Sequence, residues 1–219
     1  MKKQKHHSNI FKIDGVGVNL SNFYPVKSED EKLKLRKKYG FSQNDFILIY
    51  TAEFIPRKNH KLIFDILPDL KIQIPELKII FCGKGDLLDY YKNFAKIKEF
   101  SYAIFTGYTK DVADYCRISD VLIMPSFQEG LPMGMIEAIA TGLPVVASDI
   151  RGHRDVIENG INGFLLDVHK ILRFKDAIIK LYNEPLLRRQ MGQFNIEKAK
   201  KYSVDVVIKQ MAEIYNKIM

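Results

Sequence analysis

Residues 126–149 read SFQEGLPMGMIEAIATGLPVVASD, and this stretch predicts a loop, a helix, a tight turn and a buried strand. Pro132 suits the first helical turn, where a missing N–H costs nothing. Apolar side chains recur at helical spacing after it, at Ile136, Ile139 and Ala140. Gly142 ends the helix, and residues 145–147 (VVA) are typical of a strand buried on both faces.

The front of this predicted helix has the chemistry of a sugar phosphate site. Free N–H groups and the positive end of the helix dipole suit an anion such as phosphate. Glu129 in the loop and Glu137 on the helix flank that position, with seven residues between them. Carboxylates do not bind phosphate, but they accept hydrogen bonds from sugar hydroxyls. Two unrelated surface glutamates would have the same spacing, so the pair alone does not decide the function.

The rest of the chain repeats the alternation of strand and helix. Strands are predicted at residues 46–51, 77–82, 103–106, 121–124, 145–147 and 163–166. The first predicted helix opens at a capping box, Ser28 with Glu31 three residues on, and Asp86 is the predicted N-cap of the helix that reaches residue 97. Pro68 is expected to kink or split the helix that follows residue 60. Six strands that alternate with helices predict an α/β fold, a single doubly wound, Rossmann-like parallel sheet.

In such a sheet, ligands bind beyond the carboxyl ends of the strands. Lys58 follows the first strand, Gly83 the second, Gly107 the third and Glu129 the fourth. These residues are therefore expected to lie along one edge of the sheet. Gly83 with Gly85 lacks the full dinucleotide-binding glycine pattern, and we interpret it as a turn that lets a nucleotide approach the backbone.

Composition excludes several classes of protein. The 219 residues are 47% hydrophobic and 27% charged, and no apolar run reaches the length of a membrane span. Basic residues near the start precede no apolar core, so no signal peptide is predicted. Cys82 and Cys116 fall in apolar segments and are expected to be reduced, which favours a cytoplasmic location. The net charge is +8, but the basic residues are spread along the chain among acidic ones. A solvated charged surface is therefore favoured over a nucleic-acid groove.

Both ends of the chain have a distinct pattern. Residues 1–9 are polar and expected to fray, whereas residues 10–25 contain two glycines and a proline and are typical of a connector. Beyond residue 169 the chain predicts three helices, the last capped by Ser203. Its apolar stripe comprises Val204, Val207, Ile208, Met211, Ile214, Tyr215 and Ile218. Part of that stripe is expected to be exposed or to bind another chain.

Several motifs together resemble the signature of family 4 glycosyltransferases, which are retaining enzymes of the two-domain GT-B fold. These are the Glu129/Glu137 pair, residues 142–146 (GLPVV), residues 151–157 (RGHRDVI) and the Asn-Gly pairs at residues 159–160 and 162–163. The resemblance covers about residues 11–219, which match the second, donor-binding half of such an enzyme. It implies that residues 1–25 are a tail and interdomain linker and that residues 26–219 are one nucleotide-sugar-binding domain with C-terminal helices.

The resemblance also assigns roles to residues. Lys58 would meet the donor diphosphate, Glu129 would hold the donor sugar and Glu137 the nucleotide ribose. Catalytic roles are thus expected for Lys58 and Glu129. The full set of expected donor-binding residues is Arg57, Lys58, Gly83, Gly107, Glu129, Gly130, Leu131, Pro132, Met133 and Glu137. No metal or other cofactor is expected, and the donor would be a nucleotide diphosphate sugar, with UDP as the favoured nucleotide.

One position departs from the family pattern. Many members carry arginine where this chain has Glu53, although a branch associated with bacterial exopolysaccharide and capsule synthesis also has glutamate there. The chain resembles that branch, and Arg57 is the candidate for the missing positive charge. His153 and His169 are interpreted as structural, because neither has a partner at catalytic or metal-binding spacing.

The first, acceptor-binding domain of the fold is not part of this sequence, so we expect a truncated or split enzyme that is inactive alone. Expected partners are a separate N-terminal acceptor-domain chain and a lipid-linked acceptor at the inner face of the membrane, with no nucleic acid. A different class remains open, a non-catalytic interaction or regulatory module that uses the same fold. Binding to random DNA with a steep salt dependence would support a third, nucleic-acid-binding alternative.

Overall fold

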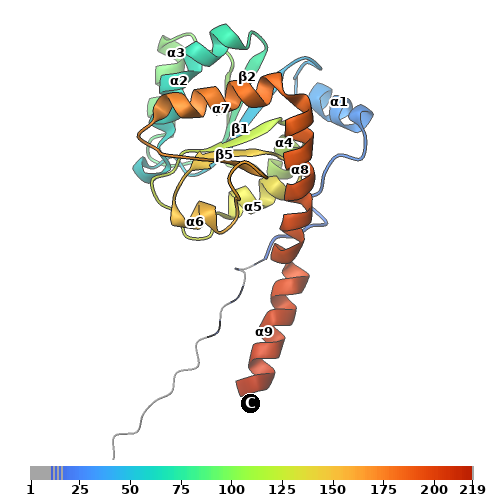
Figure 1. Cartoon of the computed structure of the whole chain (residues 1–219). Helices are drawn as coiled ribbons and strands as arrows, with labels where there is room; N and C mark the ends of the chain where they lie inside the picture. The colour runs from blue at the N-terminus through green and yellow to red at the C-terminus, as the bar shows by residue number, and fades with distance from the viewer. Residues whose placement is uncertain (1–10, 12, 14, 16, 219) are drawn as a thin grey trace, which may run out of the picture.

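The computed structural model describes residues 11, 13, 15 and 17–218, and the polar tail at residues 1–9 lies outside them. Helices and strands alternate through this part of the chain (Figure 1). The strands are β1 (Phe46–Thr51), β2 (Leu77–Cys82), β3 (Ala103–Gly107), β4 (Val121–Met124), β5 (Val145–Ser148) and β6 (Gly163–Leu166). The α-helices are α1 (Glu29–Lys38), α2 (His60–Gln73), α3 (Leu88–Ile97), α4 (Val112–Ile118), α5 (Met133–Ala140), α6 (Arg151–Arg154), α7 (Ile171–Asn183), α8 (Pro185–Ala199) and α9 (Val204–Ile218). Two 3-10 turns, η1 (Pro56–Lys58) and η2 (Lys200–Tyr202), complete the order.

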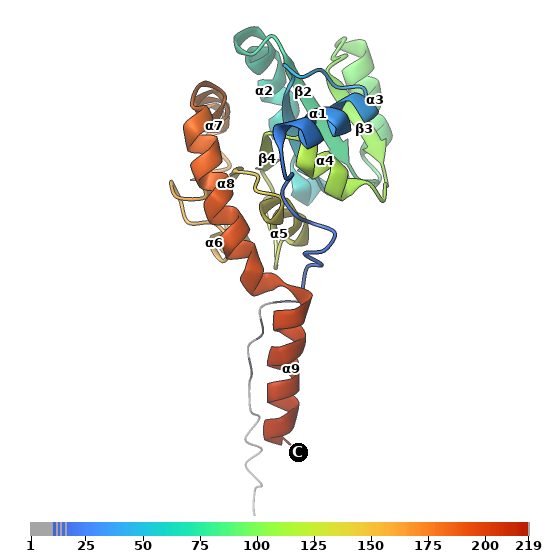
Figure 2. The ribbon, with the colours of Figure 1, turned by 90° about the vertical axis from the view of Figure 1, so that its right-hand side faces the viewer.

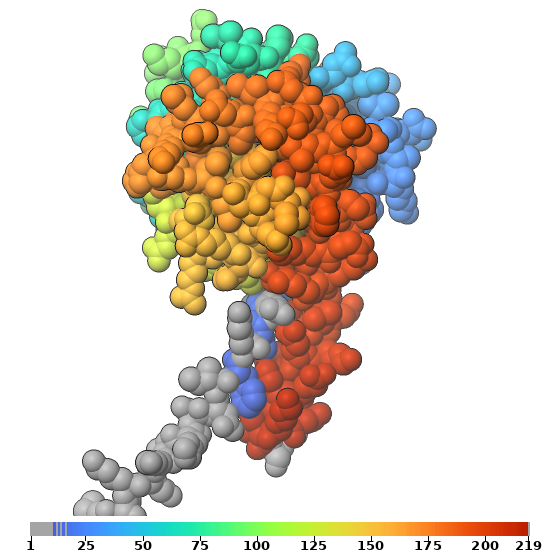
Figure 3. All heavy atoms as spheres, viewed as in Figure 1, coloured from blue at the N-terminus to red at the C-terminus, as the bar shows by residue number. Residues whose placement is uncertain are grey.

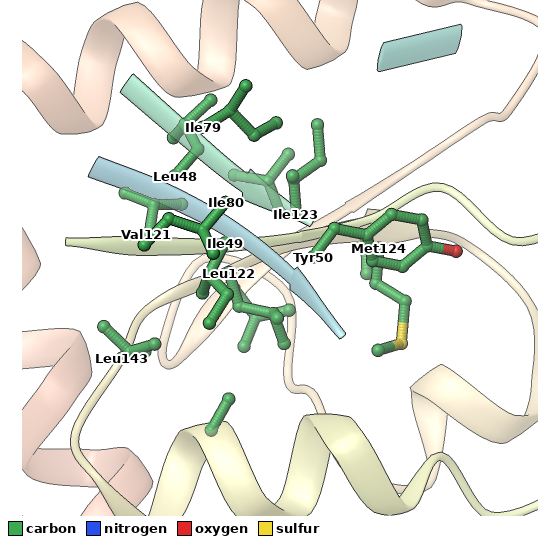
Figure 4. Close-up of a cluster of buried hydrophobic side chains, with 14 of the residues drawn as sticks. Leu48, Ile49, Tyr50, Ile79, Ile80, Val121, Leu122, Ile123, Met124 and Leu143 are labelled. Atoms are coloured by element: carbon green, nitrogen blue, oxygen red, sulfur yellow. The ribbon is translucent and has the colours of Figure 1, made fainter. Parts of the chain in front are cut away.

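The six strands form one sheet in the order β3-β2-β1-β4-β5-β6, and every pairing is parallel, which confirms the predicted doubly wound fold. The strand order reverses between β1 and β4, because β2 and β3 are added on one side of β1 and β5 and β6 on the far side of β4. The central strands are buried on both faces, as Figure 4 shows for the side chains around Ile49 and Leu122. Such burial explains why their sequences are continuous apolar runs and not alternating ones.

Helices cover both faces of the sheet. Helices α2 and α7 pack together on one face, and α4 and α5 on the other (Figure 1). Beneath α2, aromatic rings from the helix and two strands stack, with ring centroids 5.3 Å apart for Phe64–Phe81 and 5.2 Å for Phe81–Phe105. Such stacks add about 1 kcal/mol each beyond the area they bury.

Helix α1 is capped as predicted, because Ser28 Oγ accepts a hydrogen bond from the Glu31 N–H at 3.2 Å. Its buried Arg36 donates to the Ile118 carbonyl and, at 2.7 Å, to Asp120 Oδ2. Asp120 also accepts from the Ile47 N–H at the start of β1, at 2.8 Å. Arg36 therefore ties α1 to the amino ends of β1 and β4, which leaves their carboxyl ends free for a ligand.

Three local predictions need correction or refinement. Pro132 is the N-cap of α5 with ψ 86°, not its first helical residue. Asp86 is not an N-cap, because Leu87 N–H donates to the Phe54 carbonyl at 3.0 Å and the helix begins only after that contact. Pro68 lies inside α2, which continues through it without being split.

The C-terminal helices leave the body of the domain. Helix α8 packs against α5, and α9 then projects away from the sheet (Figures 2 and 3). Ser203 Oγ caps α9 through the Val206 N–H at 3.2 Å. Of its apolar stripe only Val207 is buried, and Ile208, Tyr215 and Ile218 are 58–62% exposed, so part of the stripe is exposed as expected. The connector residue Val18 pairs with Ser203 at the start of this helix.

Candidate functional site

The predicted site residues lie where the strand order of the sheet reverses, between β1 and β4. Strand β1 pairs with β2 on one side and with β4 on the other. The connections after β1 and β4 therefore leave the sheet next to each other, as expected at the switch point of a doubly wound sheet. Lys58 belongs to the first connection and Glu129 to the second.

Lys58 and Glu129 form an ion pair at this point. Lys58 Nζ lies 2.6 Å from Glu129 Oε1, and the two side chains are 14% and 7% exposed. Arg57 Nη1 lies 3.8 Å from the other carboxylate oxygen, with half of its side chain in solvent. One acidic group is thus shared between a sheltered lysine and a solvent-facing arginine.

Backbone contacts fix the position of Lys58. The Tyr50 hydroxyl at the end of β1 donates to the Lys58 carbonyl at 2.6 Å. Asn59 follows in the left-handed conformation with φ 52°, and its amide donates to the Pro125 carbonyl at 3.1 Å. The Phe127 N–H donates to the Arg57 carbonyl at 2.8 Å. The two connections are therefore joined to each other before any ligand binds.

The front of α5, which begins four residues after Glu129, supplies free hydrogen-bond donors. The N–H groups of Met135 and Ile136 bond to the Pro132 carbonyl, whereas those of Met133 and Gly134 form no hydrogen bond within the described residues. A Cβ at Gly134 would lie 2.5 Å from Thr51 Oγ1, so glycine lets the helix front sit directly on the end of β1. Two unpaired donors at a helix front favour an anion.

The other predicted residues extend the site along the sheet edge. Gly83 and Gly107 lie together at the ends of β2 and β3, where the Gly83 N–H donates to the Gly107 carbonyl at 2.9 Å. A Cβ at Gly83 would collide with the Ala52 carbonyl. Glycine is therefore required here by a close contact with the protein's own backbone. Gly130 has open space at its Cβ position. Leu131 contacts the connector at Gly15.

Glu137 lies one turn along α5 and is partly buried. Its carboxylate makes no hydrogen bond or ion pair with any residue that the structure describes, and burial raises the pKa of this group. An unpaired carboxylate held partly out of water is unfavourable for folding. Its position therefore needs a reason other than stability.

Two neighbouring residues support the Glu129 loop, and sequence reasoning assigned neither to the site, although it interpreted His153 as structural. Gly152 at the start of α6 presses on the backbone of the Glu129 loop, since a Cβ there would lie 2.7 Å from the Glu129 carbonyl. His153 is fully buried, and its Nδ1 lies 2.8 Å from the Ser148 carbonyl oxygen. No local pattern in the motif at residues 151–157 places residues 152 and 153 under a loop more than twenty residues earlier.

The loops around the site reach solvent, since the side chain of Arg57 and the residue Phe127 are about half exposed. A hollow of about 560 Å³ lies at the opposite edge of the sheet, where it is lined by Arg36, Asp120 and Pro144 among others. That hollow contains none of the predicted site residues. No cluster of three metal-binding side chains occurs in the described part of the chain. None of the helices described is both long and apolar enough to cross a bilayer.

The chain matches a protein family over most of its length. The model of the family described as "Glycosyl transferases group 1" matches residues 31–198. The "Putative glycosyltransferase EpsD" of Bacillus subtilis (strain 168) is 37% identical over 95% of this chain and 55% of that protein. An Escherichia coli "UDP-Gal:alpha-D-GlcNAc-diphosphoundecaprenol alpha-1,3-galactosyltransferase" is 27% identical over 88% of this chain and 53% of that protein. The chain spans about half the length of these relatives.

Solved structures share the fold. HepE of Anabaena in complex with UDP superposes with a TM-score of 0.81 at 21% identity, over 92% of this chain and 56% of that one. The C-terminal domain of a glycosyl transferase group 1 family protein from Francisella tularensis gives a TM-score of 0.74 at 20% identity, over 86% of this chain and all of that one. The fold of this chain is therefore that of the second half of GT-B structures.

Proposed function

The chain belongs to the glycosyl transferases group 1 family, and we propose that it is the donor-binding domain of a retaining family 4 glycosyltransferase. The observation that carries the proposal is the meeting of Lys58, Glu129 and the front of α5 at the switch point of the sheet. A lysine and free N–H groups suit a diphosphate, and carboxylates suit sugar hydroxyls. A nucleotide diphosphate sugar carries both a diphosphate and sugar hydroxyls.

In this proposal Lys58 and the N–H groups of Met133 and Gly134 bind the diphosphate. Transfer breaks the bond between the sugar C1 and the phosphate oxygen, which leaves negative charge on the outer phosphate. A preorganised donor aimed at such charge typically lowers the barrier by about 3 kcal/mol. These groups supply the charge stabilisation, so the proposal requires no metal ion.

The acidic residues and glycines position the rest of the donor. Glu129 accepts hydrogen bonds from the sugar, and Glu137 accepts them from the ribose, which gives its unpaired carboxylate a partner. Arg57 adds positive charge at the solvent side, where Glu53 is exposed and cannot contribute any. Gly83 and Gly107 lie beneath the nucleoside, and residues 130–132 beneath the diphosphate and sugar.

The relatives suggest which donor and pathway are involved. The name of the Escherichia coli relative contains UDP-Gal as donor and a diphosphoundecaprenol-linked sugar as acceptor. The Bacillus relative is a putative glycosyltransferase named EpsD. We extend these to a UDP-sugar donor, a lipid-linked acceptor at the cytoplasmic face of the membrane, and bacterial exopolysaccharide or capsule synthesis. The glutamate at position 53 supports this branch.

The open site fits one half of a cleft. Residues 1–25 would be the tail and linker, and residues 26–219 the donor domain. A first domain that binds the acceptor, in the same polypeptide or a separate chain, would cover the site and pack on the apolar stripe of α9, where Ile208 and Tyr215 are mostly exposed. The non-catalytic alternative would use the same stripe, but it gives no reason for Lys58 and Glu129 to meet.

Calorimetry with UDP and UDP-sugars tests the proposal on this chain. Binding with a dissociation constant below about 1 mM, weakened at least tenfold by Lys58→Met, is the expected result. Lys61→Met is a matched control, because Lys61 is an exposed lysine that pairs with Asp65 at 2.7 Å. Absence of heat at millimolar UDP, with the protein folded by circular dichroism, would reject the proposal.

A further inference from the structure

His153 has one ring nitrogen that no described group satisfies. The side chain is fully buried, and Nδ1 lies 2.8 Å from the Ser148 carbonyl oxygen. A carbonyl oxygen only accepts, so Nδ1 carries the hydrogen and Nε2 of the neutral ring has a lone pair. That Nε2 is buried and has no hydrogen-bond partner among the described residues. An unsatisfied buried polar atom costs about 1–3 kcal/mol, so its retention calls for an explanation.

The surroundings of this ring connect it to the Lys58–Glu129 pair. Gly152, the residue before it, packs on the carbonyls of Glu129 and Gly130. Ser148, which anchors Nδ1, donates its hydroxyl to the Ser126 carbonyl in the same loop. The charged groups that act on the ring are Glu129 and Lys58. Burial lowers the pKa of His153, and the Lys58 charge lowers it further, whereas the Ser148 carbonyl and Glu129 raise it.

A diphosphate would change this balance. Lys58 Nζ is 2.6 Å from Glu129 in the free protein, and the same ammonium is the proposed ligand of the diphosphate. A diphosphate carries more negative charge than one carboxylate, so it draws Lys58 toward itself. Glu129, only 7% exposed, then loses its closest cation. Arg57 Nη1 is then the nearest cation described, 3.8 Å away with half of its side chain in solvent. The carboxylate still lacks a close, sheltered partner, and a poorly paired buried charge is unfavourable.

We propose that His153 is a positioning residue that takes over the Glu129 carboxylate when a nucleotide diphosphate draws Lys58 away. The imidazole gains one proton from the solvent at Nε2, keeps the Nδ1 hydrogen on the Ser148 carbonyl, and donates the new N–H to Glu129. The cation near Glu129 is exchanged, and the carboxylate stays fixed for the sugar. The inference rests on the proposed function, since it requires that Lys58 meets a diphosphate.

Proton uptake on binding tests the exchange. UDP is titrated by calorimetry into the 219-residue chain in two buffers of different ionisation enthalpy, at several pH values between 6 and 8. The difference in heat gives the number of protons bound. The expected result is an uptake in the wild type that exceeds that of His153→Asn by up to about one proton. The phosphate's own protons contribute to both titrations and cancel in the difference.

The variants separate the two ring nitrogens. Asparagine at 153 can still donate to the Ser148 carbonyl from the Nδ1 position but has nothing at Nε2. His153→Asn should keep the fold and lose the proton uptake, and Glu129→Gln should lose it too, because its amide needs no counter-ion. His169→Asn removes an exposed histidine and should leave the uptake unchanged. Equal uptake in wild type and His153→Asn would overturn the inference while leaving UDP binding intact.

A second measurement needs no variant at 153 for its interpretation. The pKa of the His153 imidazole, followed by NMR with and without saturating UDP, should rise on binding. His169 serves as the internal reference. An unchanged imidazole pKa in a protein that binds UDP would overturn the inference alone. A folded protein that does not bind UDP would overturn both the inference and the proposed function.

Discussion

Lys58 and Glu129 are separated by 71 residues in the sequence, yet the ammonium and carboxylate lie 2.6 Å apart. The contact exists because β1 and β4 are neighbours in the sheet, so the connections that follow them leave the same edge side by side. Both side chains are mostly buried, at 14% and 7% exposure. The pair therefore contributes to folding and, in our proposal, to donor binding, and these contributions are separable.

A double-mutant cycle on this pair distinguishes them. Lys58→Met leaves a sheltered carboxylate without its closest cation and should lower the free energy of unfolding by about 3 kcal/mol. Adding Glu129→Gln removes the unpaired charge and should recover most of that loss. UDP affinity should stay at least about tenfold weaker in the double variant, since the lysine is still missing. Urea unfolding and calorimetry measure the two quantities, and recovery of both together would contradict separate roles.

Gly134 in the first turn of α5 and Gly130 in the loop before it should respond differently to alanine. At Gly134 the new methyl group would lie 2.5 Å from Thr51 Oγ1 and 3.1 Å from the Thr51 carbonyl oxygen. Gly134→Ala should therefore push the helix from β1 and cost about 1–3 kcal/mol of stability. Gly130→Ala meets nothing within 4 Å, so the fold should keep its melting temperature.

UDP-sugar binding provides the functional half of that comparison. If the backbone at residue 130 approaches the donor, Gly130→Ala should weaken UDP-sugar affinity despite its unchanged stability. A Gly130→Ala protein that binds like the wild type would show that the donor does not pass over this glycine. A Gly134→Ala protein as stable as the wild type would contradict the packing of α5 on β1.

Glu137→Gln should make the domain more stable and the nucleotide bind more weakly. Burial raises the pKa of the Glu137 carboxyl, so the folded state disfavours its charge. The stability penalty therefore grows as pH rises from the unfolded pKa through the higher folded pKa, and it stays constant above that. At neutral pH the variant should melt about 2 °C higher. UDP affinity should fall about tenfold with loss of a charged acceptor for the ribose. A lower melting temperature, or unchanged affinity, would count against this role.

His60 should make the protein sensitive to acid. Its ring stacks on Phe54 with centroids 4.0 Å apart, both of its nitrogens lack a partner among the described residues, and burial lowers its pKa from 6.5 to about 3. The unfolded state therefore binds a proton first as pH falls, and stability declines between those values by about 1.4 kcal/mol per pH unit from this group. His60→Phe should remove that slope. Urea unfolding from pH 7 to pH 4 measures it, and parallel curves for the two proteins would contradict the assignment.

Local sequence patterns predicted the elements better than their exact ends. Apolar runs predicted all six strands. The signal is clearest for β4 and β5, which are buried along their whole length, whereas the edge strands β3 and β6 are mostly half-buried. The ends failed where a tertiary contact intervened. Asp86 has the composition of an N-cap, but the bond from the Leu87 N–H to the Phe54 carbonyl holds the chain in a turn until Leu88. Proline was no more reliable, because Pro132 is an N-cap and α2 continues through Pro68. Gly142 did end α5 as predicted, since its positive φ of 86° is open to glycine and disfavoured for other residues.

By itself the sequence determined that the chain alternates buried strands with amphipathic helices, and that charged residues and glycines follow the strands. These features depend on spacing within a few residues, which the chain carries wherever it folds. Only the tertiary structure decided that β4 lies beside β1, that Lys58 reaches Glu129, and that His153 is sealed beneath the Glu129 loop. Strand order and burial arise from how the helices cross between strands and pack on the sheet, so no single segment encodes them.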